Sequence, residues 1–310
     1  MRLMHVWLLT MAPYFSWSQC SDPRTRLSTA AMNYEPARDR HRHRLPGGPA
    51  IETFGLTRRF GVLTAVDSAS LSVRSAEIFG LIGPNGAGKS TLIKMLTTML
   101  RPSGGRATVA GFDLRSQAGQ VRRHIGYVPP LLSADGELTG YENLLLSARL
   151  YLVPRAEREG HIRAALELMG LTEVRDRLMR QYSRGMIRRL EIAQSTLHAP
   201  SIIFLDEPTE GLDPVGRHAV WRHIRDLRAR LGAAVIVTTH YMDEADALCD
   251  RIALIERGRI LRTDTPAALK GQIGAHATLD DVFAQMTGKE AQGCSYRDVR
   301  RTRRAAREHA

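Results

Sequence analysis

The chain has 310 residues, 43% of them hydrophobic, and a formal net charge of +12, enough for one large domain or two small ones with a substantial core. Its three cysteines, Cys20, Cys249 and Cys294, are far apart and odd in number, which excludes a disulfide framework and favours a reducing compartment. No stretch approaches the roughly 18 consecutive apolar residues of a membrane-spanning helix.

The positive charge is concentrated in two tails. Residues 1–50 hold seven arginines and three acidic residues, and residues 289–310 hold seven basic and three acidic residues. We therefore expect a flexible extension over 1–49 and a basic tail over 289–310, with no nucleic-acid partner for the mildly basic body. A weaker alternative makes the last arginines an arm for nucleic acid or anionic lipid. The apolar start resembles a signal peptide, but we favour an extension with Met32 as an alternative start.

From Ile51 onwards, strand patterns alternate with helical ones. Uninterrupted apolar runs suit parallel strands that are buried on both faces. A helix is expected to end at Gly232, and a hairpin is expected to turn at Gly258. The segment from about 131 to 182 is helical throughout, as an inserted block. The strands are expected in residues 50–61, 65–75, 77–82, 106–111, 124–129, 201–206 and 233–240. This alternation predicts an α/β fold with a mainly parallel sheet and helices on both faces.

A glycine-rich segment joins one of these strands to a helix. Gly83, Gly88, Lys89 and Ser90 fit the pattern G-x-x-x-x-G-K-S/T without a gap. Glycines let successive N–H groups turn inward around a phosphate, and the helix N-terminus adds partial positive charge. Lys89 should reach the β- and γ-phosphates, and Ser90 should ligate Mg²⁺. The predicted nucleotide-binding loop consists of Gly83, Pro84, Asn85, Gly86, Ala87, Gly88, Lys89, Ser90 and Thr91.

Two later strands end in polar side chains. The run "IIFLDE" delivers Asp206 and Glu207, and the run "VIVTTH" ends in His240. Ligands bind at the carboxyl ends of strands in open α/β sheets, so Asp206 suits Mg²⁺ and Glu207 suits polarising an attacking water. A lone strand-end acid is often only solvated, and a lone histidine is usually structural. Next to the phosphate loop, however, we predict Glu207, His240 and Lys89 as catalytic residues.

With these motifs in this chain order, the sequence from about Ile51 to Gly288 resembles the nucleotide-binding subunits of ABC transporters. Phe60 matches the aromatic residue on which adenine stacks, and Asp213 matches the D-loop. Residues 182–186, "YSRGM", lie at the family signature, where Ser183 and Gly185 match the phosphate-contacting positions. The runs "YSRGMIRRLEIAQS", "DEPTEGLDP" and "ATLDDVFAQMTG" are most similar to drug-export ATPases of the daunorubicin-resistance type.

The resemblance implies a P-loop NTPase of ABC type over 50–288, in which an antiparallel β subdomain and the inserted helical subdomain flank the main sheet. Two subunits would pair head to tail, with ATP between the phosphate loop of one and the signature of the other. The helical block would dock a multi-span membrane permease on a separate chain. The protein would then be peripheral, on the cytoplasmic face of a bacterial cell membrane, and would drive export of a drug or other hydrophobic compound.

Two positions depart from the family pattern. Pro130 stands where the family has a glutamine that contacts Mg²⁺ and water and links to the helical block; proline offers neither a side-chain oxygen nor an N–H. Arg184 replaces the first glycine of the signature, and it could clash with the nucleotide, bind the γ-phosphate or turn outward. We therefore expect ATP and Mg²⁺ binding with slow hydrolysis. The alternatives are a hydrolysis-impaired regulatory subunit and an ABC-type ATPase of translation or DNA repair.

Overall fold

The structure is a computed structural model, and it describes residues 48–274 and 276–287. The two predicted tails, apart from residues 48 and 49, lie outside the described residues. Within the described part of the chain, no helix combines the length and the apolar character needed to cross a membrane.

A six-stranded sheet forms the centre of the fold, in the order β10-β9-β3-β8-β7-β6. Five strands are parallel and β10 runs antiparallel to β9, which confirms the mainly parallel sheet and the hairpin at Gly258. On β7, Ile203 and Leu205 pack into one core, whereas Ile202 and Phe204 pack into another, so the apolar runs are buried on both faces as predicted. The strands are β3 (Ile78–Ile82), β6 (Ile125–Val128), β7 (Ile202–Asp206), β8 (Ala234–Thr239), β9 (Arg251–Glu256) and β10 (Arg259–Asp264).

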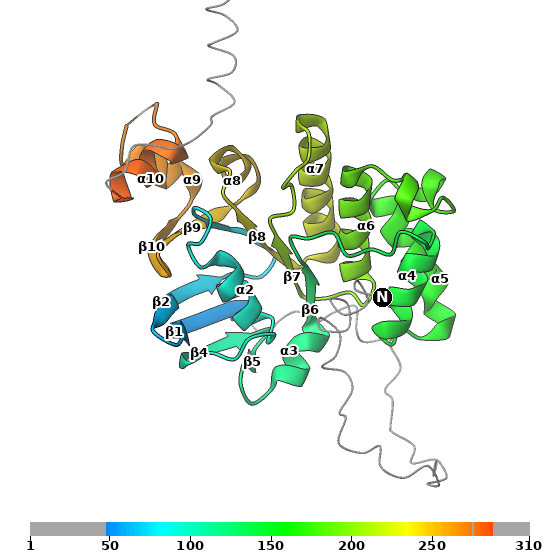
Figure 1. Cartoon of the computed structure of the whole chain (residues 1–310), viewed down its shortest axis with the longest axis horizontal. Helices are drawn as coiled ribbons and strands as arrows, with labels where there is room; N and C mark the ends of the chain where they lie inside the picture. The colour runs from blue at the N-terminus through cyan, green and yellow to red at the C-terminus, as the bar shows by residue number, and fades with distance from the viewer. Residues whose placement is uncertain (1–47, 275, 288–310) are drawn as a thin grey trace, which may run out of the picture.

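A second, antiparallel sheet has the order β2-β1-β4-β5. It lies on one side of the central sheet, and α2 and α3 complete that layer (Figure 1). This arrangement confirms the predicted fold class, a mainly parallel sheet with an antiparallel partner. The elements are β1 (Ile51–Phe60), β2 (Leu63–Val73), α2 (Lys89–Leu96), β4 (Gly104–Val109), β5 (Phe112–Asp113) and α3 (Ala118–His124).

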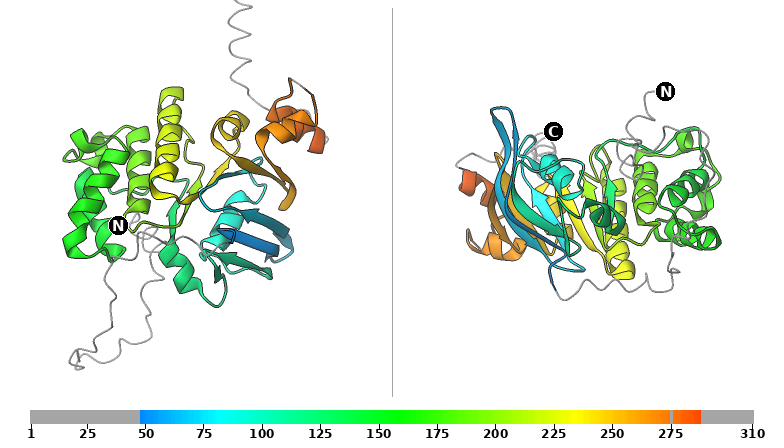
Figure 2. Two further views of the ribbon diagram at one scale, coloured as in Figure 1. Left: turned by 180° about the vertical axis from the view of Figure 1, so that it is seen from behind. Right: turned by 90° about the horizontal axis from the view of Figure 1, so that it is seen from below.

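The remaining helices share the core on the other face of the central sheet. In both views of Figure 2, α4, α5 and α6 stand together at the end of the molecule opposite the antiparallel sheet. The helices α4 and α5 fall inside the block expected at about 131–182; its status as a separate subdomain stays a prediction. The elements are α4 (Gly140–Leu150), α5 (Arg155–Leu168), η4 (Thr172–Val174), η5 (Met179–Gln181), α6 (Arg184–Thr196), α7 (Pro214–Leu231), α8 (Met242–Leu248), α9 (Pro266–Gly271) and α10 (Leu279–Thr287).

Local chemistry sets the ends of these helices. At the start of α4, the Thr139 hydroxyl accepts from the Glu142 N–H at 3.1 Å, while the Glu142 carboxylate accepts from the Thr139 N–H at 2.8 Å. This reciprocal capping box satisfies two donors that a helix start leaves open. At its C-terminus, α7 is capped by Gly232, which has a φ of 63° and is the residue at which the sequence predicted the helix to stop. Glycine takes this left-handed conformation without the clash of a side chain.

His198, just beyond α6, joins the helical layer to the start of β6. Its ring stacks on Tyr151 with centroids 4.0 Å apart, and Nε2 lies 3.0 Å from the Ile125 carbonyl. Because the carbonyl only accepts, Nε2 carries the proton, and the buried Nδ1 has no hydrogen-bond partner. Burial therefore disfavours the imidazolium and lowers the pKa of His198 from 6.5 to about 4.

This shift makes stability depend on pH. The folded state binds its proton more weakly than the unfolded state, so the stability from neutral His198 is lost as pH falls from 6.5 towards 4. We expect His198→Gln to remove up to about 3 kcal/mol of that acid-side loss, measured by urea unfolding at several pH values. His218→Gln, an exposed histidine on α7, is the control. Equal pH slopes in the wild type and His198→Gln would contradict the assignment.

Candidate functional site

The predicted phosphate loop, residues 83–91, connects β3 to α2. Gly88 has a φ of 105°, and a Cβ at this position would lie 2.5 Å from the Ala65 carbonyl oxygen on β2. A side chain here is excluded both by backbone conformation and by packing. Pro84, Asn85 and Gly86 are exposed, so the loop has a rigid base and an open rim. This is the form of a phosphate-binding loop.

Lys89 places its ammonium group inside this loop. Its Nζ donates to the Gly83 carbonyl at 2.7 Å and to the Pro84 carbonyl at 3.2 Å. The same Nζ lies 3.1 Å from Glu207 Oε1, and the Lys89 side chain is only 5% exposed. The two carbonyls and the carboxylate thus compensate the charge of this buried cation.

Asp206 ends β7 opposite the loop. Its Oδ1 accepts from the Thr238 hydroxyl at 2.5 Å and from the Ser90 hydroxyl at 3.2 Å. Its Oδ2 is buried and has no partner. Burial raises the pKa of Asp206, against the hydrogen bonds from Thr238 and Ser90 and the nearby Lys89 charge. The site therefore contains a desolvated carboxylate oxygen that lacks a positive or donor partner.

Glu207 is held in an unusual backbone conformation. Its φ is 50°, a region that non-glycine residues rarely adopt and that concentrates at functional sites. The Glu207 N–H donates to the Thr238 hydroxyl at 2.9 Å. Its two carboxylate oxygens are then divided between Lys89 Nζ, at 3.1 Å, and His240 Nδ1, at 2.9 Å. Glu207 is thus oriented between a cation and an imidazole, as a general base for water requires.

Thr238 orients both acids but is not among the site residues predicted from the sequence. It lies one residue from the end of β8 and pairs with Asp206 in the parallel register. Its hydroxyl donates to Asp206 and accepts from Glu207. From the sequence, residues 233–240 are predicted only as a buried strand that ends in His240. The two consecutive threonines before His240 were the available signal, because a buried hydroxyl needs a hydrogen-bond partner.

The residues around the loop fit a magnesium–nucleotide ligand. Mg²⁺ prefers oxygen donors and is usually held by one or two carboxylates together with substrate phosphates. Ser90 Oγ and the unpartnered Asp206 Oδ2 provide such oxygens. In the described residues, no group of three or more His, Cys, Asp or Glu side chains forms an all-protein metal cage.

The signature residues form a second group. Ser183 caps α6 and accepts from the Met186 N–H at 3.3 Å, and Asp213 caps α7 and accepts from the Gly216 N–H at 2.6 Å. A Cβ on Gly185 would lie 3.8 Å from Gly216, so the starts of α6 and α7 are adjacent. In the part of the chain that the structure describes, no hydrogen bond or ion pair links Ser183 or Asp213 to the phosphate loop. Arg184 is exposed and lies against Gly211, its Nη1 3.0 Å from where a Cβ of that glycine would be.

Phe60 lies at the end of β1, with 45% of its surface exposed. The Arg58 guanidinium is 4.5 Å from the ring centroid, which is a cation–π contact. The exposed ring suits the stacking role predicted for it, and no described hydrogen bond joins it to the loop.

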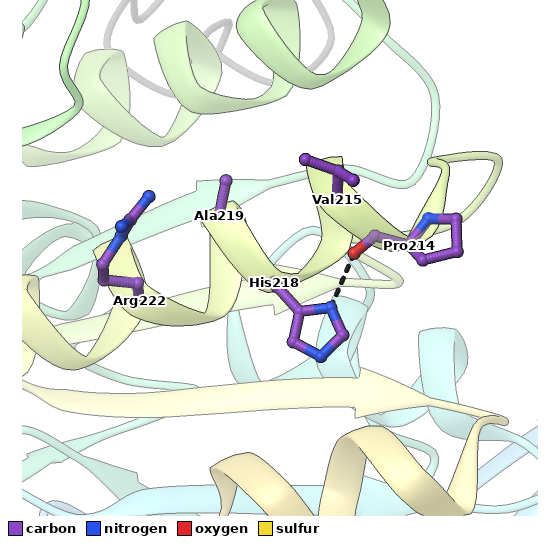
Figure 3. Close-up of a pocket in the computed structure, with 5 residues that line it drawn as sticks. All are labelled: Pro214, Val215, His218, Ala219 and Arg222. Atoms are coloured by element: carbon purple, nitrogen blue, oxygen red, sulfur yellow. Dashed lines mark hydrogen bonds between the residues drawn. The ribbon is translucent and has the colours of Figure 1, made fainter.

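A shallow hollow lies along α7, beyond Asp213 (Figure 3). Within it, His218 Nδ1 lies 2.6 Å from the Pro214 carbonyl, and Val215 is 79% exposed. None of its lining residues belongs to the predicted nucleotide set. The lining residues are Pro214, Val215, His218, Ala219 and Arg222.

Comparison with known proteins agrees with this geometry. A family model described as "ABC transporter" matches residues 66–210. The chain is 44% identical over 245 residues to the daunorubicin/doxorubicin resistance ATP-binding protein DrrA of Streptomyces peucetius, covering 79% of this chain and 71% of that protein. It is 42% identical over 220 residues to the Nod factor export ATP-binding protein I of Mesorhizobium japonicum, covering 71% and 64%. A solved ATP-binding subunit of an ABC transporter superposes with a TM-score of 0.68 at 29% identity, covering 77% of this chain and 99% of that one.

A substitution at Thr238 tests how Asp206 and Glu207 are oriented. Thr238→Val keeps the shape of the side chain but removes the hydroxyl that orients Asp206 and Glu207. We expect kcat for nucleotide hydrolysis to fall about ten- to hundredfold, and the Mg²⁺ concentration for half-maximal rate to rise. Thr97→Val removes a buried hydroxyl that donates to Ile93 in α2 and serves as the control. Steady-state phosphate release that is unchanged in Thr238→Val would refute the orienting role.

Proposed function

The chain belongs to the ATP-binding proteins of ABC transporters, and on that premise we propose that it powers a separate multi-span membrane permease. It is an ATPase, converting ATP and water to ADP and phosphate. The observation that carries the proposed site is the chain of contacts from Lys89 through Glu207 to His240. These three groups come from the start of α2 and from the ends of β7 and β8, and they converge at the phosphate loop.

We assign the steps of hydrolysis to these residues. The loop amides and Lys89 bind the β- and γ-phosphates, and Lys89 moves from the Pro84 and Gly83 carbonyls to phosphate oxygens. Glu207 accepts a proton from the attacking water, with its carboxylate oriented by His240 and by the Thr238 contact to its backbone. Phe60 stacks on the adenine. Ser90 and Asp206 would hold Mg²⁺, which when bound neutralises charge on the phosphates.

The signature residues suit a second subunit. Ser183, Gly185 and Asp213 lie at the adjacent starts of α6 and α7, and in the described residues no hydrogen bond or ion pair joins Ser183 or Asp213 to the phosphate loop. Ser183 and Asp213 are exposed, so they remain accessible to a nucleotide bound elsewhere. We infer that they complete the site of a partner ATPase subunit in a head-to-tail dimer.

Exposed leucines support docking to a permease. Leu131, in the segment after β6, is 76% exposed, and Leu146 and Leu150 on α4 are 40% and 37% exposed. Apolar side chains on the helical block suit a protein partner. The relatives named above act in drug resistance and in Nod factor export, which supports export of a drug or other hydrophobic compound. We place the protein peripherally on the cytoplasmic face of a bacterial cell membrane.

Nucleotide binding and turnover can be separated by two variants. Lys89→Ala should weaken ATP binding about ten- to hundredfold, because charge-assisted phosphate contacts are lost. Glu207→Gln should keep binding but lower kcat by about a hundredfold or more. Calorimetric titration with ATP and Mg²⁺, together with phosphate release, measures both effects. Lys94→Ala changes an exposed lysine on the same helix and is the control. Intact binding in Lys89→Ala would overturn the site assignment.

The two departures from the family pattern predict slow turnover. Pro130→Gln restores a side-chain oxygen at the end of β6, and Arg184→Gly removes the guanidinium beside Gly211. We expect at least one change to raise kcat several-fold, with about a hundredfold as the upper limit for one restored polar contact. Phosphate release at saturating ATP is the measurement. If both variants hydrolyse ATP no faster than the wild type, these positions do not limit the rate.

A further inference from the structure

The segment that follows β6, residues 129–134, is held by a buried arginine of α6. Arg188 Nη1 donates to the Pro129 carbonyl at 2.7 Å, and its Nη2 donates to the Pro130 carbonyl at 2.6 Å. The planar guanidinium thus spans two successive carbonyls, a geometry that lysine cannot reproduce. Pro130, which has no polar side chain, is fixed through its backbone.

A glutamate one turn further along α6 holds the other end of the segment. Glu191 Oε1 accepts from the N–H and hydroxyl of Ser133 and, at 3.3 Å, from the N–H of Ala134. Its Oε2 accepts from Arg188 Nη1 at 3.0 Å. The two side chains are each 3% exposed. Arg188 and Glu191, called the latch below, therefore bind both ends of the segment and each other.

The next residue is held independently. The Asp135 N–H donates to Asn143 Oδ1 at 3.0 Å, and Asn143 belongs to α4. Between these attachments, Leu131 remains 76% exposed. The latch thus holds the polar backbone of the segment while leaving an apolar side chain outside.

Stability alone gives little reason for a buried ion pair at this place. Burial raises the pKa of Glu191 and lowers that of Arg188, against the attraction between the two charges. Apolar side chains of similar volume often stabilise a fold as well as such a pair does. Apolar side chains could not form the directional hydrogen bonds that this pair makes to the segment after β6, at Pro129, Pro130, Ser133 and Ala134.

Two further carboxylates, near the end of β7, act on Arg188. The charges of Asp206 and Glu210 favour its protonated form, as does Glu191. The guanidinium of this α6 residue therefore binds the segment after β6 and is also near enough to Asp206 and Glu210 for their charges to act on it. Helix α6 begins with the signature residues, so its position bears on both groups of site residues.

We propose that Arg188 and Glu191 are positioning residues for ATP hydrolysis, which fix the segment after β6 to the signature helix. The latch takes the place of the side-chain link that Pro130 cannot make, so that a movement of α6 carries this segment with it. This inference rests on the proposed function for its kinetic consequence, but the attachment itself can be tested without ATP.

The attachment is tested by residue-resolved hydrogen exchange on the full chain. In Glu191→Ala, the amides of Ser133 and Ala134 should exchange roughly tenfold faster or more, because each loses its acceptor. The Asp135 amide, bound to Asn143, should change less. Arg188→Met should also speed exchange at Ser133 and Ala134, because Glu191 loses its partner. Arg189→Met is the matched control: Arg189 is the next residue of α6 and donates to Met169 on the opposite side, at 2.8 Å.

The kinetic consequence is a split between kcat and KM. In both latch variants we expect kcat to fall about ten- to hundredfold, with KM for ATP unchanged within about twofold, since the phosphate loop and Phe60 are untouched. Arg188→Lys keeps the charge but loses the two-carbonyl fork, so it should resemble Arg188→Met. A merely structural role would lower thermal stability and shift KM together with kcat.

Each result decides the proposal. Unchanged exchange at Ser133 and Ala134 in both variants would show that the latch does not hold the segment. Faster exchange with unchanged kcat would remove its role in hydrolysis. If a single variant fails to fold, Arg188→Met/Glu191→Leu replaces the pair by apolar side chains, which folds tolerate, and the same two outcomes apply. Absence of ATP hydrolysis in the wild type would overturn the proposed function and leave the exchange result standing.

Discussion

The parallel register of three neighbouring strands places every group of the phosphate site. β3 pairs with β8 so that Ile82 lies beside Thr239, and β7 pairs with β8 so that Asp206 lies beside Thr238. The phosphate loop leaves β3, the acids leave β7, and His240 follows β8. Strand ends only about 4.8 Å apart bring these groups within hydrogen-bond reach. A slip of one residue would turn the side chains to the opposite face of the sheet.

Much of this arrangement could be predicted from the sequence because its signals are local. The loop from Gly83 to Thr91 is one continuous motif, and the apolar runs before Asp206 and His240 identify buried strands with their ends. Thr238 and the latch were not predictable, since their roles come from contacts between segments far apart in the chain. Arg188 meets Pro130 across 58 positions of sequence. In the sequence, Arg188 is one of several arginines in the same helical segment, and the pattern does not distinguish it from the others. In the structure, its burial and its hydrogen bonds to two carbonyls distinguish it.

The buried charges and the strained backbone of the site cost free energy of folding, which the rest of the fold must offset. Lys89, Asp206 and Glu207 are all buried, and Glu207 keeps a left-handed backbone conformation. A buried charge is tolerated when it is paired or hydrogen-bonded, and each of these has such partners except for Asp206 Oδ2. A magnesium ion at that oxygen would complete the pairing. Among Lys89, Asp206 and Glu207, Asp206 Oδ2 is thus the polar atom that the protein itself does not pair.

A second buried carboxylate connects the two groups of site residues. Glu244, on α8, accepts from the Thr209 hydroxyl at 2.8 Å and from the Trp221 indole N–H at 2.7 Å. Thr209 lies two residues after Glu207, Trp221 lies on the helix that Asp213 caps, and α8 follows His240. Burial raises the pKa of Glu244, whereas these hydrogen bonds lower it. Removing the Glu244 carboxylate would leave two buried donors, the Thr209 hydroxyl and the Trp221 N–H, without an acceptor. One side chain thus links α7, whose start carries Asp213, to the segment that follows Glu207. The Glu244 carboxylate therefore sets the position of the second group relative to the acids through hydrogen bonds within one chain.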